Sequence, residues 1–345
     1  MSTRATRSTP WPEARRIAGE GAVALEPVQV TLEGALGAAL AASLHAPGPL
    51  PTHDTAAMDG YAVTGSEPWT VRGSLRAGDP PPRNPLRPGE AVEIATGAPV
   101  PERAEAVLPY EQASRREDVV TGEHEVGRHI RRRGEDCVAG DLLLPAGTVL
   151  TPTALGLAAG VGQDVLEVHR APQVAVALTG NEIVRTGLPA PGRVRDAIGP
   201  MLPGTVRWAG GEPWETQQLR DKTGALEEMI TATDADVVVV CGSSSAGPAD
   251  HLRPTLRALD AEVLVSSVAC RPGHPMVLAR VPSGPWVVGL PGNPYAALVS
   301  ALTLLVPLLA GLAGRRPPRP RWATAGTGIR SHPRDTRLVA ARRTG

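Results

Sequence analysis

The residue best placed to do chemistry in this sequence is a carboxylate in a turn-rich loop. Asp59 stands in a turn that ends at Gly60, directly ahead of a strand-like segment, and Thr96 lies in the turn-rich segment 95–101. A carboxylate held rigidly in this way can act as a base or orient a nucleophilic oxygen; otherwise it caps a turn. The Pro-rich segment 290–294 has the same rigid character. We expect an active site assembled from these loops.

Three further acids are candidate ligands for a hard cation. Glu182 follows the apolar run 174–178, Asp250 ends the Gly/Ser-rich segment 242–250, and Asp221 lies between them along the chain. Magnesium takes oxygen ligands and usually keeps waters and substrate phosphates in its shell. Each acid alone is also explained as a solvated surface residue. Together the three acids predict a magnesium site.

The segment 242–250 joins a predicted strand to a predicted helix. Backbone N–H groups, serine hydroxyls and a helix N-terminus form the combination that cradles phosphate or another oxyanion. A flexible connector with Asp250 as a helix cap explains the same residues. The residues of this loop that we expect to contact a ligand are Gly242, Ser243, Ser245 and Gly247.

Two segments carry positive charge. Arg271 opens the loop 271–275 and can grip a phosphate through two parallel hydrogen bonds, while His274 can donate or carry a pH-dependent charge. The alternatives are a surface charge for Arg271 and a turn residue between prolines for His274. The second segment is the basic run of Arg128, Arg131, Arg132 and Arg133, which is either a phosphate-binding patch or a solvated surface.

Composition narrows the class of protein. A chain of 345 residues exceeds what one hydrophobic core usually supports, which predicts two or three domains. Lys plus Arg and Asp plus Glu number 35 each, so no charge excess points to nucleic acid or an anionic membrane surface. Three cysteines without metal-ligand spacing fit a reducing cytoplasm. The first 16 residues lack the apolar core of a secretory signal, and the apolar run 296–312, interrupted by Pro307, predicts a buried helix.

The texture of the sequence changes along the chain. Leucines at four-residue spacing over 28–44 predict a helix, and short β-like pieces between Pro and Gly clusters over 61–126 predict a small β-rich domain. A cap and an early proline at 151–153 predict a helix over 154–161.

The second half of the chain has an α/β pattern. Continuous apolar runs at 174–178 and 237–240 are typical of parallel strands covered on both faces. Helices are predicted at 225–232 and 250–258, and further strands at 262–265 and 286–290. The pattern of residues 174–312 therefore predicts a doubly wound sheet. Ligands of such sheets bind at the carboxyl ends of the strands.

As a set, these motifs resemble the molybdopterin molybdenumtransferase family, which includes the gephyrin E domain. The segments that carry the resemblance occur in the family order and are 55–62, 95–101, 130–136, 179–182, 272–275 and 290–294. The resemblance implies an elongated multidomain homodimer that binds adenylylated molybdopterin, inserts molybdate at its dithiolene and releases AMP with a divalent cation.

The resemblance also implies roles for individual residues. Glu182, Asp221 and Asp250 would serve the metal and the phosphate, while Asp59 and Thr96 would face the substrate from the other subunit. The residues implied to shape the pterin and molybdate pocket are Ser245, Arg271, Pro272, His274, Pro275, Pro291, Asn293 and Pro294.

Several positions depart from the family pattern. Ser243 replaces the second glycine of the phosphate loop, Arg271 and His274 replace two lysines, and Ile198 ends a turn that usually reads Asp-Ser-Asn. Asn181 provides one carboxylate fewer than the aspartate that is commoner at this position. These departures motivate an alternative function, namely a catalytically weak paralogue that binds a pterin nucleotide or a partner protein without turnover. A third reading, an adenylyltransferase, is less favoured because related single-domain proteins lack the Asp59 and Thr96 segments.

The predicted architecture is multidomain α/β plus β. Its parts are a disordered tail (1–20), an N-terminal helical and linker domain (21–60 with 127–172), an inserted β-rich domain (61–126), a doubly wound molybdopterin-binding domain (173–313) and a truncated C-terminal β remnant (314–345).

Overall fold

A computed structural model provides the structure of the protein. It describes residues 8–220, 222–242, 251–320, 323–330 and 335–342. Two compact units result, and each is described by itself. Unit 1 comprises residues 1–42, 146–155 and 164–345, whereas unit 2 comprises residues 43–145 and 156–163. The predicted helix at 154–161 is confirmed as α2 (Pro152–Gly160), whose residues belong to both units. The finer five-part division stays a prediction.

Unit 1 is built on a six-stranded sheet in the order β17-β14-β18-β22-β21-β19. Its strands are β14 (Gln173–Thr179), β17 (Glu212–Leu219), β18 (Val237–Cys241), β19 (Glu262–Val265), β21 (Val277–Arg280) and β22 (Trp286–Leu290). β17, β14, β18 and β22 are parallel, as the apolar runs predicted. β21 and β19 are antiparallel, so the expectation of a parallel sheet is wrong at this edge. The connection 281–285 between β21 and β22 is a tight turn, too short for a parallel crossover.

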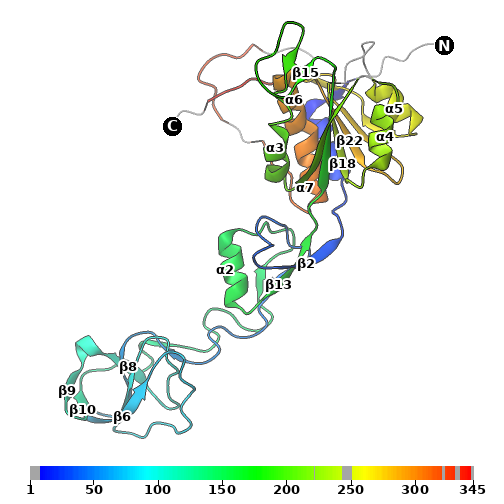
Figure 1. Cartoon of the computed structure of the whole chain (residues 1–345). Coiled ribbons are helices and arrows are strands. Elements are labelled where there is room, and N and C mark those ends of the chain that lie inside the picture. The colour runs from blue at the N-terminus through cyan, green and yellow to red at the C-terminus, as the bar shows by residue number, and fades with distance from the viewer. Residues whose placement is uncertain (1–7, 221, 243–250, 321–322, 331–334, 343–345) are drawn as a thin grey trace. The chain divides into compact units, whose positions relative to one another are not determined.

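Helices cover both faces of this sheet (Figure 1). On one face lie α1 (Trp11–Glu20), α3 (Leu202–Ala209) and the long helical segment Pro294–Leu312; on the other lie α4 (Ala225–Ala232) and α5 (Leu252–Ala258). Alternate residues of one strand enter different cores, since Val239 packs with the first group and Val238 with the second. The predicted helices at 225–232 and 250–258 are confirmed over the described residues.

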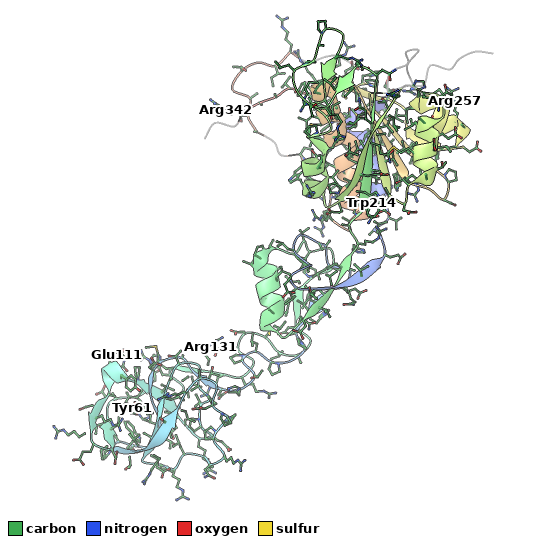
Figure 2. The ribbon with its side chains drawn as sticks, viewed as in Figure 1. Tyr61, Glu111, Arg131, Trp214, Arg257 and Arg342 are labelled. Carbon is green, nitrogen blue, oxygen red and sulfur yellow. The ribbon has the colours of Figure 1, made fainter. Side chains whose placement is uncertain are left out.

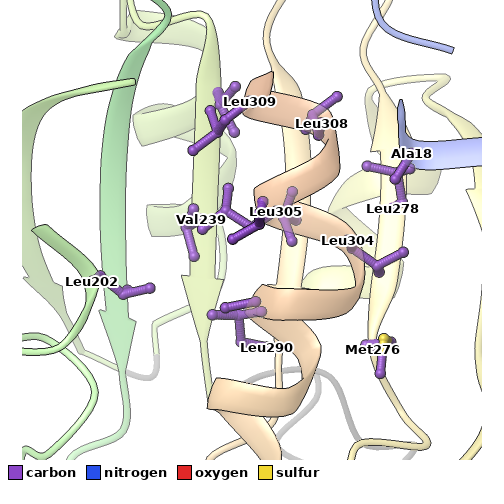
Figure 3. Packing of buried hydrophobic residues seen from close by; sticks show 14 of the residues in the cluster. Ala18, Leu202, Val239, Met276, Leu278, Leu290, Leu304, Leu305, Leu308 and Leu309 are labelled. Carbon is purple, nitrogen blue, oxygen red and sulfur yellow. The ribbon is translucent and has the colours of Figure 1, made fainter. Parts of the chain in front are cut away.

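The segment Pro294–Leu312 is the centre of the larger core. It runs as α6 (Pro294–Ser300), a π-helical turn η2 (Ala301–Leu305) and α7 (Val306–Leu312). Leu304, Leu305, Leu308 and Leu309 are fully buried against the sheet (Figure 3). The amide of Val306 bonds to the Ala301 carbonyl, and this wider turn accommodates Pro307.

Length and hydropathy alone would let this segment cross a bilayer. Its mean hydropathy is 2.1, yet 78% of the stretch is buried inside the protein. It is therefore the core helix of unit 1, as predicted from the sequence.

The N-terminal region differs from the prediction of a disordered tail. Trp11–Glu20 form α1, with Ala14 and Ala18 fully buried against the larger core. The Trp11 indole N–H donates to the Thr303 hydroxyl at 3.0 Å. The small apolar residues that seat this helix are hard to recognise among arginines and prolines, because alanine gives only a weak hydrophobic signal.

The helix predicted over 28–44 is wrong. Residues Pro27–Thr31 form β2, which pairs with β13 (Val165–His169). The chain then runs beside 148–150 and 167, with Leu40 N–H bonded to the Thr148 carbonyl and Ala41 N–H to that of Glu167. β-branched residues at the start and the left-handed backbone of Gly37 (φ 79°) outweigh the leucine spacing.

Unit 2 contains a six-stranded sheet in the order β8-β5-β7-β6-β10-β9. The strands are β5 (Gly60–Thr64), β6 (Trp69–Leu75), β7 (Glu90–Ile94), β8 (Ala106–Pro109), β9 (Ser114–Arg116) and β10 (Val119–Thr121), and a 3₁₀ turn η1 (Tyr110–Gln112) follows β8. Two apolar clusters fill its two faces, one around Ala62 and Ile94 and the other around Trp69 and Leu108. The β-rich character predicted for 61–126 is confirmed.

Short pairings complete both units. Unit 2 contains β3 (Leu44–His45) with β12 (Leu142–Leu144), and β4 (Thr55–Ala56) with β11 (Ile130–Arg131). Unit 1 contains β15 (Ile183–Val184) with β16 (Val194–Arg195), and β1 (Thr9–Pro10) and β23 (Thr336–Arg337) on either side of β20 (Val268–Arg271).

The core segment yields a stability prediction. We expect Leu305→Ala to lower the free energy of unfolding by about 2–5 kcal/mol, because it removes a fully buried side chain and leaves a cavity. Leu302→Ala, on the same turn but 38% exposed, is the matched control and should cost about 1 kcal/mol or less. Urea denaturation followed by circular dichroism measures both, and equal losses would contradict this packing.

Candidate active site

Three predicted motif segments of unit 2 meet at β4. On one side, Thr55 and Ala56 pair with Arg131 and Ile130 of β11. On the other side, the Ala56 amide bonds to the Ala98 carbonyl and the Gly97 amide to the Ala56 carbonyl, at 3.0 and 2.8 Å. The backbone of this short strand therefore joins segments 55–62, 95–101 and 130–136, which are far apart in the sequence.

Asp59 and Thr96 are brought into direct contact by this junction. The Thr96 amide and hydroxyl both donate to Asp59 Oδ1, at 2.6 and 2.9 Å. The amide, and then the hydroxyl, lower the pKa of Asp59 below its ordinary value. Both side chains are exposed, and Oδ2 takes no part in either bond. The site therefore presents a carboxylate that stays ionised at neutral pH and is fixed through one oxygen.

Gly60 has a packing role in this turn. A Cβ at this position would lie 2.0 Å from the Leu108 carbonyl oxygen of β8. Only glycine lets β5 pass so close to its neighbour directly after Asp59. The glycine thus fixes where the carboxylate emerges, without contributing chemistry itself.

The arginine run of β11 and its following turn is held by acids of the same unit. Arg131 donates to both carboxylate oxygens of Asp136 at 2.6 Å, and Arg132 donates to Asp54 Oδ2 at 2.6 Å. The Arg133 amide donates to Asp54 Oδ1 at 2.8 Å. Figure 2 shows Arg131 away from the six-stranded sheet of unit 2, in which Tyr61 lies. Two of the three arginines are therefore engaged in holding the loop, which favours a structural role for the run.

Asp54 is a site residue that sequence reasoning missed. Burial raises its pKa, but the Arg133 amide and the Arg132 guanidinium more than offset this, so the net shift is downward. The available signal was its position five residues before Asp59; its arginine partners lie 78 and 79 residues further along the chain.

In unit 1, the strand ends bring the second group of predicted segments to one edge. Leu178, Cys241 and Leu290 are in register on β14, β18 and β22. The Thr179 hydroxyl donates to the Cys241 carbonyl at 2.8 Å, and the Gly242 amide donates to the Leu290 carbonyl at 3.0 Å. The segments beginning at 179, 242 and 291 therefore leave the sheet side by side.

Glu182 lies at the lip of this edge. Its carboxylate folds back over Gly180, since a Cβ on that glycine (φ 124°) would lie 2.7 Å from Glu182 Oε2. The side chain is exposed and offers the hard oxygen donors that magnesium prefers. Among the residues that the structure describes, no group of three acids, histidines or cysteines could hold a metal ion.

Several predicted site residues lie outside the described residues. They are Asp221, Ser243, Ser245, Gly247 and Asp250. Of the predicted metal ligands, the structure describes Glu182, and its carboxylate is the type of ligand that a divalent cation takes.

Asp196 is a second residue that sequence reasoning passed over. Its buried carboxylate accepts hydrogen bonds from the amides of Ile198 and Gly199, at 3.0 and 2.8 Å. Burial, and then the Asp196 charge, raise the pKa of the Cys241 thiol. The departure at Ile198 has a packing explanation, because this side chain enters the larger core of unit 1. Asp196 thus holds the turn beneath the strand ends.

The cationic loop begins at the end of β20, and its two basic residues are placed differently. Arg271 Nε donates to Asp335 Oδ2 at 2.6 Å, so this guanidinium is already paired. His274 is exposed, and its carbonyl accepts from the Val268 amide at 3.0 Å. Pro272 and Pro275 of the same loop are partly buried.

The turn after β22 starts the core helix. Pro291 is buried, and the Asn293 carboxamide oxygen accepts from the Ala296 amide at 3.0 Å, which caps α6. Pro294 occupies the first helical position, where its missing N–H costs nothing. Asn293 therefore has a structural role in addition to its predicted contact with substrate.

Comparisons with known proteins cover most of the chain. Residues 9–162 match the family described as "MoeA N-terminal region (domain I and II)", and residues 175–311 match the "Probable molybdopterin binding domain". "Molybdopterin molybdenumtransferase 2" of Mycobacterium tuberculosis is 35% identical over 94% of this chain and 85% of its own length. "Molybdopterin molybdenumtransferase" of Haemophilus influenzae is 34% identical over 77% and 68%.

A solved structure is also similar. The molybdopterin biosynthesis moea protein from Pyrococcus horikosii superposes with a TM-score of 0.76 at 32% identity, covering 90% of this chain and 81% of that one. The similarity thus extends over both units.

The ion pair at Asp54 predicts a pH dependence. Because folding lowers the pKa of Asp54 below its ordinary value of 3.8, its stabilisation is complete above that value and is lost as the pH falls through the folded pKa. Between pH 7 and pH 3 the wild type should therefore lose more stability than Asp54→Asn. Thermal unfolding at the two pH values tests this, with Asp118→Asn, an exposed acid of the same unit, as the control. A loss as large in Asp54→Asn as in the wild type would contradict the assignment.

Proposed function

The chain belongs to the molybdopterin molybdenumtransferase family, and we propose that it inserts molybdate into adenylylated molybdopterin, with magnesium-dependent release of AMP. It is accordingly a transferase of molybdenum cofactor biosynthesis. The observation that carries the detailed proposal is the Asp59–Thr96 contact, in which a motif hydroxyl and amide fix a motif carboxylate that faces solvent.

Asp59 is proposed to act as an ionised acceptor. Its lowered pKa makes it a weak general acid and a weak base at neutral pH. A fixed carboxylate is well suited to accept hydrogen bonds from the substrate and to orient it. Thr96 sets the direction of Asp59 through two bonds, so its role is positioning.

The strand-end loops of unit 1 are proposed to bind the phosphate groups. Ligands of doubly wound sheets bind at the carboxyl ends of parallel strands, and Glu182, Gly242 and the turn after β22 all lie there. Gly242 has φ 99° and approaches the Thr179 carbonyl closely, so a side chain there would be strained. A side chain is therefore disfavoured at the point where the chain leaves β18.

Magnesium is proposed to lie beside Glu182, with Asp221 and Asp250 as the other protein ligands. When bound, it neutralises charge on the phosphoanhydride, which is the chief requirement of phosphoryl chemistry. Glu182 would hold the ion, and the proposed anion-binding residue Arg271 would compensate further charge. Departure from the family pattern at His274 leaves one reliably charged group fewer in this loop.

A homodimer with an active site shared between subunits is part of the proposal. The two groups of candidate residues belong to different units, Asp59 and Thr96 to unit 2 and Glu182 to unit 1. The family resemblance implies that each site joins unit 2 of one subunit to unit 1 of the other. The three cysteines are free and buried, which supports a cytoplasmic location.

The weak-paralogue alternative has less support. The two relatives of this chain at 34–35% identity are named as transferases. One departure that motivated it, Ile198, is explained by burial in the core. Activity of the purified protein decides between the two functions.

We expect Glu182→Gln to lower the rate of molybdate- and magnesium-dependent AMP release by on the order of 10²-fold, because a charged ligand next to developing charge is lost. Glu212→Gln, an exposed acid at the start of β17, should leave the rate unchanged. AMP is quantified after incubation of purified protein with adenylylated molybdopterin. Wild-type release that does not exceed that of Glu182→Gln would contradict the proposed function.

Co-expression of two inactive variants tests the shared site. If Asp59→Asn and Glu182→Gln each abolish turnover, a mixed dimer holds one intact site, so a statistical mixture should recover about a quarter of the wild-type rate. Unmixed variants expressed alone serve as controls. Recovery no greater than the average of the two variants would show that both residues act within one subunit.

A further inference from the structure

The C-terminal strand is anchored on the strand that leads into the cationic loop. β23 pairs in parallel with β20, with Thr336 opposite Cys270 and Arg337 opposite Arg271. The Leu338 amide bonds to the Arg271 carbonyl at 2.9 Å. We call residues 335–340 the C-terminal strap. Its backbone follows β20 to the residue at which the proposed anion-binding loop begins.

Asp335 of the strap occupies the Arg271 guanidinium. The two side chains form an ion pair of 2.6 Å in which Arg271 is 68% exposed and Asp335 only 15% exposed. Burial, and then the Asp335 charge, raise the pKa of the Cys270 thiol to about 11, which agrees with a carboxylate lying against the end of β20. The acid is therefore fixed on the protein, whereas the arginine reaches towards solvent.

A cavity lies beside this ion pair. Its volume is about 650 Å³, within the range of small-molecule sites. Arg271, Pro272 and Tyr295 line one side, and residues 337–340 of the strap line the other. The Tyr295 hydroxyl donates to the Leu338 carbonyl at 3.3 Å, so it joins the two walls. A ligand that used Arg271 from this cavity would be in contact with the strap.

We propose that Asp335 determines the oxyanion affinity of Arg271, because the strap holds an internal carboxylate on the guanidinium for which a substrate phosphate or molybdate must compete. This inference rests on the proposed function in one respect, namely that Arg271 belongs to the substrate-binding loop. The strap thereby tunes a site in which arginine stands at a position where the family pattern has lysine.

Removal of the competing charge should strengthen anion binding. We expect Asp335→Asn to bind molybdate and AMP about three- to tenfold more tightly than the wild type, the range of a partly exposed ion pair. Isothermal titration calorimetry of the full chain at low ionic strength measures this, with Asp234→Asn, an exposed acid of the same unit, as the matched control. Arg271→Gln should weaken binding of both probes and remove the effect of Asp335→Asn in the double variant.

A second variant releases the strap without changing charge. Leu338→Pro removes the amide that bonds to Arg271, so it should also tighten anion binding while Asp335 is retained. Thermal unfolding of each variant shows whether unit 1 remains folded. An unchanged or weaker affinity in both folded variants overturns the proposal, as does an equal gain in the Arg271→Gln background.

Binding and turnover are measured separately. Tighter anion binding by Asp335→Asn, without AMP release by any variant, supports the proposed role of the strap and contradicts the proposed function. Normal AMP release, with no change in anion affinity in Asp335→Asn, contradicts only the proposed role of the strap. Absence of anion binding in both wild type and Asp335→Asn overturns the inference directly.

Discussion

The packing of apolar parallel strands between two helical layers is the constraint on which the rest of unit 1 depends. β14, β18 and β22 carry side chains that are buried on both faces, so their register is set by two cores at once. A slip by one residue would exchange the residues of the two cores. With the register fixed, the three strands end level, and the loops that carry Thr179, Gly242 and Pro291 must leave at one edge. The chemistry proposed for that edge thus follows from hydrophobic packing beneath it.

In unit 2 the candidate residues are positioned mainly by backbone pairing and polar contacts. β4 is only two residues long, yet its backbone holds two motif segments, and charged side chains complete the junction. Asp54 ties the arginine run to this strand, and Thr96 ties its own segment to Asp59. Exposed ion pairs contribute little to stability individually, but several converging on one short strand restrict its geometry. The carboxylate is accordingly fixed by polar contacts, and the strand-end loops by apolar ones.

The C-terminal strap connects structure with affinity. β20 is flanked by β1 on one side and β23 on the other, so both terminal regions of unit 1 support the strand before the cationic loop. The same residue that anchors the loop, Asp335, also offsets its charge. An anion site with such an internal partner can release its product more readily than an uncompensated arginine, because every dissociation is assisted by a carboxylate already in place. Stability of the loop and modest affinity for anions would then have one physical origin.

The sequence by itself determined the family, the α/β nature of residues 174–312 and most helices and strands of that part, because continuous apolar runs and ordered loop motifs are local signals. It also singled out Asp59 and Thr96 as candidate site residues, and the structure places these two in direct contact. The sequence misled in two segments. At 28–44 the leucine spacing predicted a helix, but the start of this segment pairs with the distant strand β13. At 11–20 the weak hydrophobic signal of alanine did not reveal a helix that packs on the core helix. Only the tertiary structure decided that Asp54 holds Arg132, that Asp196 holds the turn below the sheet and that Asp335 holds Arg271. Asp54 and Asp335 bind arginines that are remote in the sequence, and Asp196 gains its donors only in one particular turn conformation. These contacts depend on the folded chain, so the sequence carries no local pattern that predicts them.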